Sequence, residues 1–416
     1  MEKQNIFKKK LKRHLYFKKM VSCAELSNLT NKSLPFTTKF LNELIAEGSV
    51  VETGFANSTG GRRAQMYSLK PDINFILAVA MDQYITKMNV LDMHNHPMTE
   101  DFKVELPLHN NPDSLSQLRT HIVQFLSKSK ISKDKFIGIG ISMPGFVDVK
   151  KGLNHSFLDA GDTNIVDYIR EEIDLPVLID NDSSLIALVE MRLGIARNHK
   201  NVMVINIGWG VGLGMILDGE LFRGHNGFAG EFSHIPVFKD NEKICSCGKT
   251  GCLETETSLL VIIEKAIFGL KKGRMSVLNN LSFDHLEAAC CAIMDAAYKG
   301  DTFAVELFSK AGYNLGLGIA ILLTLLNPEL IVLSGRGAEA GRLWLAPIQQ
   351  AINEHCIPKI AEDTQIKIST LGPRADLIGA AALVMENYDS MQTGNVPIAI
   401  GMKMKNEIAN KKIKTA

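Results

Sequence analysis

Three short motifs lie close together in the middle of the chain: IGWGVGLG at 207–214, GEFSH at 230–234 and CSCGKTGCLE at 245–254. The first continues an apolar run, 202–208, and its glycines allow a tight turn after a buried strand. The second places a carboxylate and an imidazole on one short segment, and the third gathers three cysteines. Together the motifs predict a strand that leads into a ligand-binding region ordered by a metal.

The cysteine motif predicts a zinc site. Cys245, Cys247 and Cys252 offer three thiolates on one loop, and reduced thiols rarely cluster at this spacing without a metal. His234, eleven residues before Cys245, can supply the fourth ligand. The other cysteines show no such pattern and are expected to be core or surface residues: Cys23, Cys290, Cys291 and Cys356.

Further apolar runs flank this region and predict an α/β fold. Each of the four runs ends in turn-forming residues, and they span 76–82, 136–142, 202–208 and 330–335. Helical patterns between them span 114–128, 184–193 and 303–326. The runs do not alternate with polar residues, so we expect both sheet faces to be covered and the ligand loops to follow the carboxyl ends of the strands.

The N-terminal residues differ from this body in charge. Residues 1–70 contain 13 Lys and Arg against 5 Asp and Glu, a net charge of +8, and the rest of the chain carries −7. This asymmetry predicts a head that binds a polyanion, attached to an acidic body.

The head shows the pattern of a winged helix-turn-helix. Two helical patterns, 24–29 and 35–47, are separated by the polar residues 30–33, and a β-hairpin with a glycine-rich tip follows at 50–69. The second helix is the candidate recognition helix. The residues expected to contact operator DNA are Lys32 and Ser33 in the turn before this helix, Thr37, Thr38 and Lys39 on the helix, and Arg62 and Arg63 on the wing.

The body, residues 75–388, resembles the ROK family of repressors, open reading frames and sugar kinases, which have a two-lobed actin-like, ribonuclease-H-like fold. The three motifs quoted above carry the resemblance, and with the head the whole chain is similar to the sugar-responsive repressors of that family. The implied organisation is a winged helix-turn-helix over 1–72, a first lobe over 73–195, a second lobe with the zinc loop over 196–388, whose terminal helix returns to the first lobe, and a basic tail over 389–416.

The resemblance also implies a sugar site and a closed, structural Zn²⁺ held by His234 and the three clustered cysteines. The positions that match the family's sugar contacts are Gly145, Asn181, Asp182, Glu231, His234 and Glu254. Carboxylates and amides suit a polyhydroxylated ring because each buried hydroxyl needs a partner. Ser184 and Ser233 stand where the family usually has Asn and Gly, which leaves the preferred hexose open.

Kinases of the family bind ATP phosphates with two glycine-containing loops, and this chain departs from both. The first loop keeps Asp82, but Tyr84 and Ile85 replace its two glycines. The second has Trp209 where a kinase usually has Thr. Bulky and β-branched side chains fill the phosphate position and disfavour positive φ, so we expect no phosphoryl transfer.

The leading hypothesis is a cytoplasmic repressor that binds operator DNA as a homodimer or tetramer and responds to a sugar or sugar phosphate between its lobes. Asp182, the general base of the kinases, then only accepts a hydrogen bond from a sugar hydroxyl. Two alternatives stay open: an ATP-dependent hexose or N-acetylhexosamine kinase with a DNA-binding extension, and a repressor released by a protein partner. No signal peptide or membrane span is expected.

Overall fold

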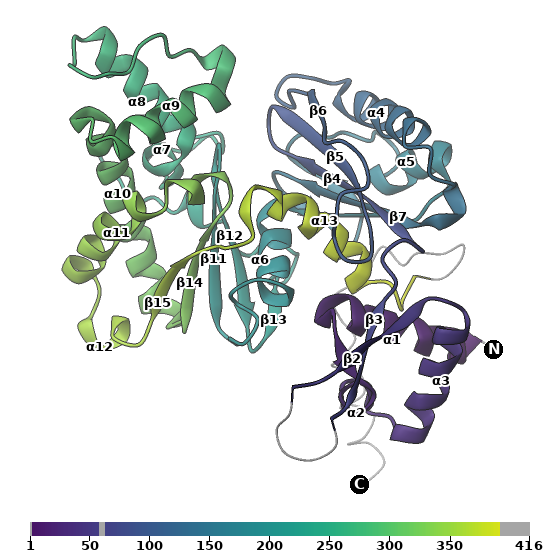
Figure 1. The fold of residues 1–416 in the computed structure, drawn as a ribbon. Helices are drawn as coiled ribbons and strands as arrows, with labels where there is room; N and C mark the ends of the chain where they lie inside the picture. Colours follow the sequence, from purple (N-terminus) through teal and green to yellow (C-terminus); the bar gives the residue numbers. More distant parts are fainter. Residues whose placement is uncertain (1, 58–62, 392–416) are drawn as a thin grey trace, which may run out of the picture. The chain divides into compact units, whose positions relative to one another are not determined.

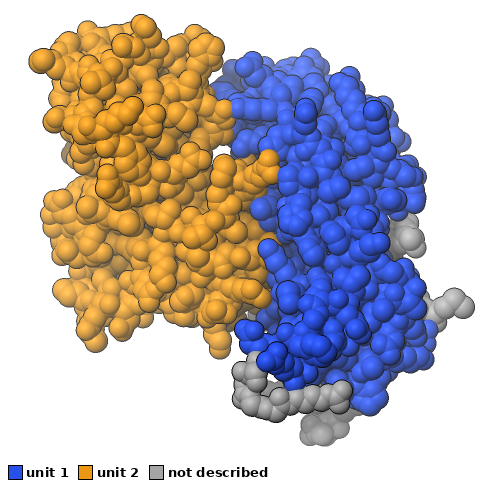
Figure 2. All heavy atoms as spheres, viewed as in Figure 1, with its two compact units in different colours: residues 1–185, 377–416 blue, residues 186–376 orange. Residues whose placement is uncertain are grey.

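The computed structural model describes residues 2–57 and 63–391, and the chain divides into two compact units (Figure 2). Unit 1 comprises Met1–Leu185 and Leu377–Ala416, and unit 2 comprises Ile186–Asp376. Each unit has its own five-stranded sheet. Two helices cross the division between the units, namely α6 (Asp182–Arg192) and α13 (Ala375–Glu386).

The N-terminal part of unit 1 is a winged helix-turn-helix (Figure 1). Its elements are α1 (Glu2–Lys18), β1 (Val21–Ser22), α2 (Cys23–Thr30), α3 (Leu34–Ala46), β2 (Val50–Phe55) and β3 (Gln65–Leu69). The three strands pair in the order β1-β3-β2. The helix pair and the hairpin confirm the predicted head. Helix α1 was not predicted, although Phe7, Leu11 and Leu15 recur at helical spacing and are buried beneath its lysines.

The body of unit 1 is a mixed sheet in the order β10-β7-β4-β5-β6. The strands are β4 (Phe75–Met81), β5 (Ile85–Leu91), β6 (Phe102–Glu105), β7 (Phe136–Met143) and β10 (Val177–Asn181). Helices α4 (Ser114–Lys128) and α5 (Ile165–Ile173) share one hydrophobic core with the sheet. Helix α13 packs closely on β7, because a Cβ added to Gly140 would lie only 1.9 Å from the Ala380 carbonyl oxygen.

Unit 2 is built on a sheet in the order β13-β12-β11-β14-β15. The strands are β11 (Val202–Ile207), β12 (Val211–Leu217), β13 (Glu220–Phe222), β14 (Leu330–Ser334) and β15 (Gln365–Ile368). The helices that follow α6 in this unit are α7 (Glu254–Thr257), α8 (Leu259–Lys271), α9 (Leu286–Tyr298), α10 (Thr302–Leu326), α11 (Arg342–His355) and α12 (Pro358–Ala361). Helix α10 is long and apolar enough to be a candidate membrane span by those two measures, but more than half of its most apolar stretch is buried inside the unit.

The predicted α/β body is confirmed. The four predicted strands are β4, β7, β11 and β14, and the predicted helices are α4, α6 and α10. The antiparallel strands β5, β6, β12 and β13 were not predicted. Strands β6 and β13 lie at sheet edges and are partly exposed, so they lack a continuous apolar run.

Two expected boundaries differ from the structure. The units divide at Leu185, inside α6, whereas the expected lobes meet between residues 195 and 196. The basic tail was expected from residue 389, but Asp389 forms an ion pair with Arg13 at 3.0 Å and Met391 is buried. These residues therefore belong to unit 1, and the rest of the expected tail, 392–416, lies outside the described residues.

Candidate functional site

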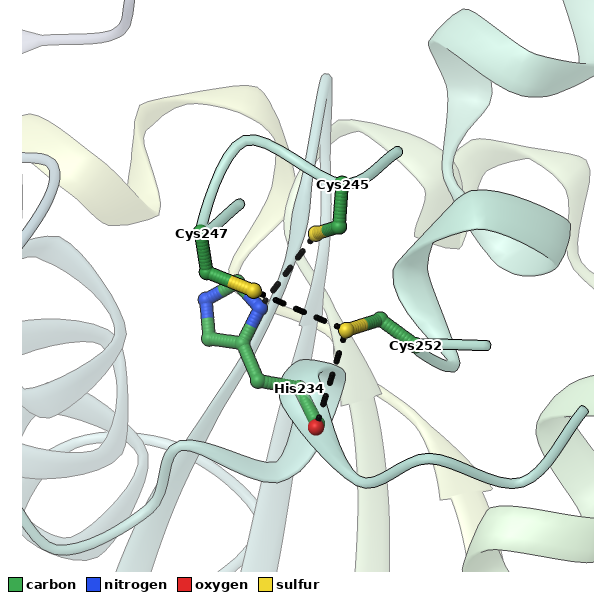
Figure 3. A group of neighbouring side chains, drawn as sticks. All are labelled: His234, Cys245, Cys247 and Cys252. Atoms are coloured by element: carbon green, nitrogen blue, oxygen red, sulfur yellow. Dashed lines mark hydrogen bonds between the residues drawn. The ribbon is translucent and has the colours of Figure 1, made fainter. Parts of the chain in front are cut away.

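Four potential metal ligands converge in unit 2 (Figure 3). The ligand atoms of His234, Cys245, Cys247 and Cys252 all lie within 4.8 Å of one another. The Cys247 and Cys252 sulfurs are 3.6 Å apart, and the Cys245 sulfur lies 3.5 Å from His234 Nδ1. The cluster predicted from the sequence is therefore brought together with the geometry of a metal site.

The loop that carries the cysteines is closed by its own backbone. Two glycines adopt positive φ, Gly248 at 79° and Gly251 at 76°. A Cβ on Gly251 would lie 2.5 Å from the Phe238 carbonyl oxygen, so no side chain fits there. The Cys245 amide donates to the Lys249 carbonyl at 2.8 Å, which turns the chain back on itself.

The carboxylates Glu231 and Glu254 border this cluster. Glu254 is the first residue of α7, and its Oε2 accepts a hydrogen bond from the Val211 amide at 3.2 Å. A Cβ on Gly210 would lie 2.5 Å from the same oxygen, so the glycine permits the contact. Glu231 Oε2 lies 3.7 Å from His234 Nε2. His234 thus faces the cysteines with one ring nitrogen and a carboxylate with the other.

Unit 1 holds the other three predicted sugar contacts at the carboxyl ends of two paired parallel strands. Gly145 follows β7, and Asn181 and Asp182 end β10 and begin α6. Asn181 Nδ2 donates to the Gly145 carbonyl at 3.1 Å. Gly145 has a φ of 88°, and a Cβ there would meet the Ser156 side chain at 2.5 Å. Asn181, Asp182 and Gly145 are partly exposed, so their polar atoms are within reach of a ligand.

The two positions that depart from the family pattern, Ser184 and Ser233, lie beside predicted sugar contacts. The Ser184 amide donates to Asn181 Oδ1 at 3.1 Å, which fixes the amide orientation. Ser233 is buried in the short turn η2 (Phe232–His234).

The backbone amides of the loop at Asp82 form hydrogen bonds within the loop. Asp82 Oδ1 accepts hydrogen bonds from the Tyr84 and Ile85 amides, both at 2.8 Å, and the Asp82 amide donates to the Ile85 carbonyl at 2.9 Å. Burial raises the pKa of the half-buried Tyr84. The Tyr84 and Ile85 amides are therefore held by the Asp82 carboxylate.

The loop at Trp209 is filled by side chains. Trp209 is 4% exposed, and the Gly208 amide donates to the Gly210 carbonyl at 2.8 Å across it. The guanidinium of Arg336 lies over the indole, and Arg336 Nη1 donates to Glu287 Oε1 at 2.6 Å. The contacts of Arg336 with Trp209 and Glu287 were not predicted from the sequence, because nothing in the spacing links these residues.

The head places most predicted DNA contacts at the surface, with one correction. Lys32, Ser33, Thr38 and Lys39 are exposed, as is Arg63 on the wing, and Arg62 lies outside the described residues. Thr37 is 0% exposed, and its hydroxyl donates to the Ser33 carbonyl at 3.1 Å. The prediction for Thr37 is therefore wrong, because this position of α3 faces the core.

The other four cysteines stand apart from the metal cluster. Cys290 and Cys356 are buried, Cys23 is half-buried and Cys291 is exposed. Burial raises the pKa of Cys290 to about 12, so its side chain stays a neutral thiol. This agrees with their assignment as core and surface residues.

The known proteins that are similar to this chain differ in how much of it they match. The ROK family model matches residues 83–387. A glucokinase from Halalkalibacterium halodurans is 37% identical over 70% of this chain and 90% of its own length. A xylose repressor from Caldicellulosiruptor bescii is 27% identical over 89% of this chain and 92% of its own length. The glucokinase is thus more similar in sequence than the xylose repressor, but it matches a smaller part of this chain.

A solved structure matches nearly the whole chain. The crystal structure of a ROK family transcriptional regulator, described as a homologue of the Escherichia coli Mlc protein, aligns with a TM-score of 0.72 and 25% identity. It covers 94% of this chain and 98% of the regulator. The family model, the glycine and cysteine motifs and the two-unit fold agree, and the chain belongs to the ROK family.

Proposed function

We propose that this protein is a sugar-responsive, DNA-binding transcriptional repressor of carbohydrate uptake or metabolism genes. The observation that carries the proposal is the joining of a winged helix-turn-helix to a ROK body in one chain. The repressor relative and the regulator structure match 89% and 94% of the chain, which is more than the body alone, whereas the glucokinase matches 70%.

Each unit carries its own set of proposed sugar contacts. Asn181, Asp182 and the Gly145 backbone supply the contacts from unit 1, and Glu231, His234 and Glu254 supply those from unit 2. The carboxylates accept hydrogen bonds from sugar hydroxyls, and the amide can both donate and accept. A sugar that binds one conformation of the protein more tightly than another can alter DNA binding through this differential affinity.

The metal is zinc in this proposal, and the four ligands fit it. A tetrahedral Zn²⁺ with ordinary bond lengths separates two sulfurs by about 3.8 Å and a sulfur from a nitrogen by about 3.5 Å. The corresponding distances of 3.6 Å and 3.5 Å match. Four protein ligands leave no open position, so the ion serves to order the segment between Glu231 and Glu254.

DNA recognition is assigned to the exposed N-terminal end of α3 and to the wing. Lys32, Thr38 and Lys39 present charge and hydrogen-bonding groups to a major groove, and Arg63 reaches a phosphate or the minor groove. A homodimer or tetramer in the cytoplasm would present two such heads to the two halves of an operator.

Phosphoryl transfer is not part of the proposal, because the sequence departs from the kinase pattern at both phosphate loops and the contacts of those loops support this reading. The amides at Tyr84 and Ile85 are held by Asp82, and Trp209 lies under Arg336. The 37% identity to a glucokinase favours a second candidate function, an ATP-dependent sugar kinase with a DNA-binding head, in which Asp182 would be the general base.

One experiment tests both functions. A duplex selected from a random-sequence pool by the purified chain is used in gel retardation with D-glucose, D-xylose, N-acetyl-D-glucosamine and their phosphates. We expect at least one of these to change the DNA affinity. Retardation that is unchanged by every sugar would overturn sugar response and favour release by a protein partner. Phosphorylation of a sugar by ATP, abolished in Asp182→Asn, would establish the kinase instead.

A further inference from the structure

Helix α1 is attached to the C-terminal segment of unit 1 by side chains from two successive turns. Arg13 Nη1 forms an ion pair with Asp389 at 3.0 Å and donates to the Glu386 carbonyl at 3.2 Å. One turn earlier, Lys9 Nζ donates to the Met391 carbonyl at 2.7 Å. Residues 386–391 follow directly on α13, so this contact joins opposite ends of the chain.

This contact is partly buried. The Arg13 and Asp389 side chains are 23% and 20% exposed, and Met391 is 5% exposed. Lys9 also lies over the ring of Tyr388, and burial lowers the pKa of this lysine. A shielded arginine contact of this kind, in which Nη1 is shared between a carboxylate and a backbone carbonyl, holds its geometry better than an exposed pair does.

A second set of contacts joins the head to the turn after β5. The hydroxyl of Tyr16, a fully buried residue of α1, donates to Asn95 Oδ1. The Met93 amide donates to the Pro71 carbonyl at 3.1 Å, and His94 Nε2 lies 2.8 Å from the Leu69 carbonyl. These contacts fix the short connection between β3 and β4 to the turn after β5.

The helix that receives these contacts is itself fixed to the recognition helix. Lys8 forms ion pairs with Glu43 at 2.8 Å and Glu47 at 2.6 Å on α3, and the rings of Phe7 and Phe40 are 5.3 Å apart. A displacement of α1 should therefore move α3 with it, because ring packing and ion pairs join the two helices.

Helix α13 also packs closely on the body of unit 1. A Cβ on Gly379 of α13 would lie 2.9 Å from the Leu185 carbonyl oxygen of α6, and Gly140 permits the same closeness to β7. Helix α6 begins with Asp182, one of the proposed sugar contacts. The sugar-binding edge of unit 1, α13 and α1 form one continuous packed path.

We propose that the contacts of Arg13 with Glu386 and Asp389 and of Tyr16 with Asn95 form a head–body clamp, which makes the DNA-binding head move with the body of unit 1. Sugar binding that changes the conformation of the unit-1 body then repositions α3 directly. This inference rests on the proposed function, because it names how the sugar response reaches the DNA. Arg13, Tyr16, Asn95 and Asp389 are positioning residues in it.

The test uses charge reversal and its rescue in the full-length chain. The variants are Arg13→Asp, Asp389→Arg and the exchange of both, and Lys3→Asp is the matched control, since it makes the same charge change at an exposed position of α1. For each, affinity for the selected duplex is measured with and without the most effective of D-glucose, D-xylose and N-acetyl-D-glucosamine. Sugar affinity is measured separately by calorimetry.

We expect the sugar to change DNA affinity by about 5- to 150-fold in the unaltered chain, the usual range for coupled sites. Either single reversal should bring this ratio close to one while sugar affinity is retained, and the exchange should restore it. Lys3→Asp should weaken DNA binding with and without sugar and leave the ratio unchanged. A ratio that survives both single reversals, or that the exchange does not recover, would overturn the clamp.

Hydrogen exchange without sugar or DNA separates this inference from the proposed function. Protection of the α1 amides should fall in Arg13→Asp and recover in the exchange variant. Unchanged protection overturns the clamp whatever the ligand is. Reduced and recovered protection in a chain that binds none of the sugars would support the clamp and overturn the sugar response.

Discussion

The guanidinium carbon of Arg336 lies 4.3 Å from the centre of the Trp209 indole ring. Arg336 begins the short turn η4 (Arg336–Ala340) after β14, and Trp209 lies in the turn between β11 and β12. Glu287 of α9 pairs with the guanidinium at 2.6 Å. Two loops that follow neighbouring strands are thereby joined by side chains, and a cation over an indole contributes about 0.5–2 kcal/mol depending on its exposure.

Removing both stacked side chains should open the second phosphate loop. In Trp209→Thr with Arg336→Ala, we expect binding of a fluorescent ATP analogue that the unaltered chain does not bind, measured by fluorescence anisotropy. Turnover should remain absent, because Asp82 still holds the amides of the first loop. Arg342→Ala removes another arginine stacked on an aromatic ring, that of Tyr298, and serves as the control. Analogue binding to the unaltered chain would contradict the prediction.

The negative charge of Glu254 should contribute to sugar affinity, apart from the hydrogen bond that Glu254 accepts from the Val211 amide. Glu254→Gln keeps an oxygen for the Val211 amide but loses the charge. A hydrogen bond to a charged group contributes about 1.5–3 kcal/mol, so sugar affinity should fall by about 10- to 150-fold in calorimetry. Glu242→Gln changes an exposed residue of the same loop and should have no effect. Equal affinities for the two variants would remove Glu254 from the sugar site.

The metal cluster predicts one tightly bound zinc per chain. Elemental analysis of the purified protein should find it, and Cys247→Ser should reduce both the zinc content and the thermal midpoint, because four ligands hold the loop. Cys291→Ser alters an exposed cysteine outside the cluster and should change neither. A full complement of zinc in Cys247→Ser would show that the ion is held elsewhere.

Two neighbouring residues of α3 should respond differently. Lys39→Ala should weaken DNA binding across sequences and reduce the slope of log affinity against log salt by about one. Thr37→Val should leave that slope unchanged, since Thr37 is fully buried, and should alter stability by about 1 kcal/mol through loss of the bond to the Ser33 carbonyl. Filter binding over a salt series and urea unfolding measure the two effects. A changed salt slope in Thr37→Val would mean that α3 is oriented otherwise.

Stability should depend on pH through Glu190, a fully buried residue of α6. Burial raises its pKa above the ordinary value of 4.5, against hydrogen bonds from Ser369 and the Ile195 amide that lower it. A raised folded-state pKa gives stability that is complete below pH 4.5 and is lost as pH rises through the folded value. Glu190→Gln should remove this decline in the free energy of unfolding, measured by urea unfolding from pH 4.5 to neutrality. Parallel curves for the two proteins would contradict it.

The sequence by itself determined the features that depend on local spacing. Three cysteines and two glycines within eight residues can converge with few alternatives, and the structure brings them together with His234. Continuous apolar runs also predicted the central strands, because a strand that is buried on both faces has apolar residues at successive positions. The edge strands β6 and β13 were missed because their partial exposure breaks that pattern.

The tertiary structure decided what depends on which surfaces meet. The burial of Thr37 is set by the packing of α1 and α2 on α3, and helical spacing alone does not say which face is covered. The stacking of Arg336 on Trp209 and the pairing of Arg13 with Asp389 join residues more than a hundred positions apart. Such contacts depend on the three-dimensional course of the chain, and no local pattern in the sequence records them.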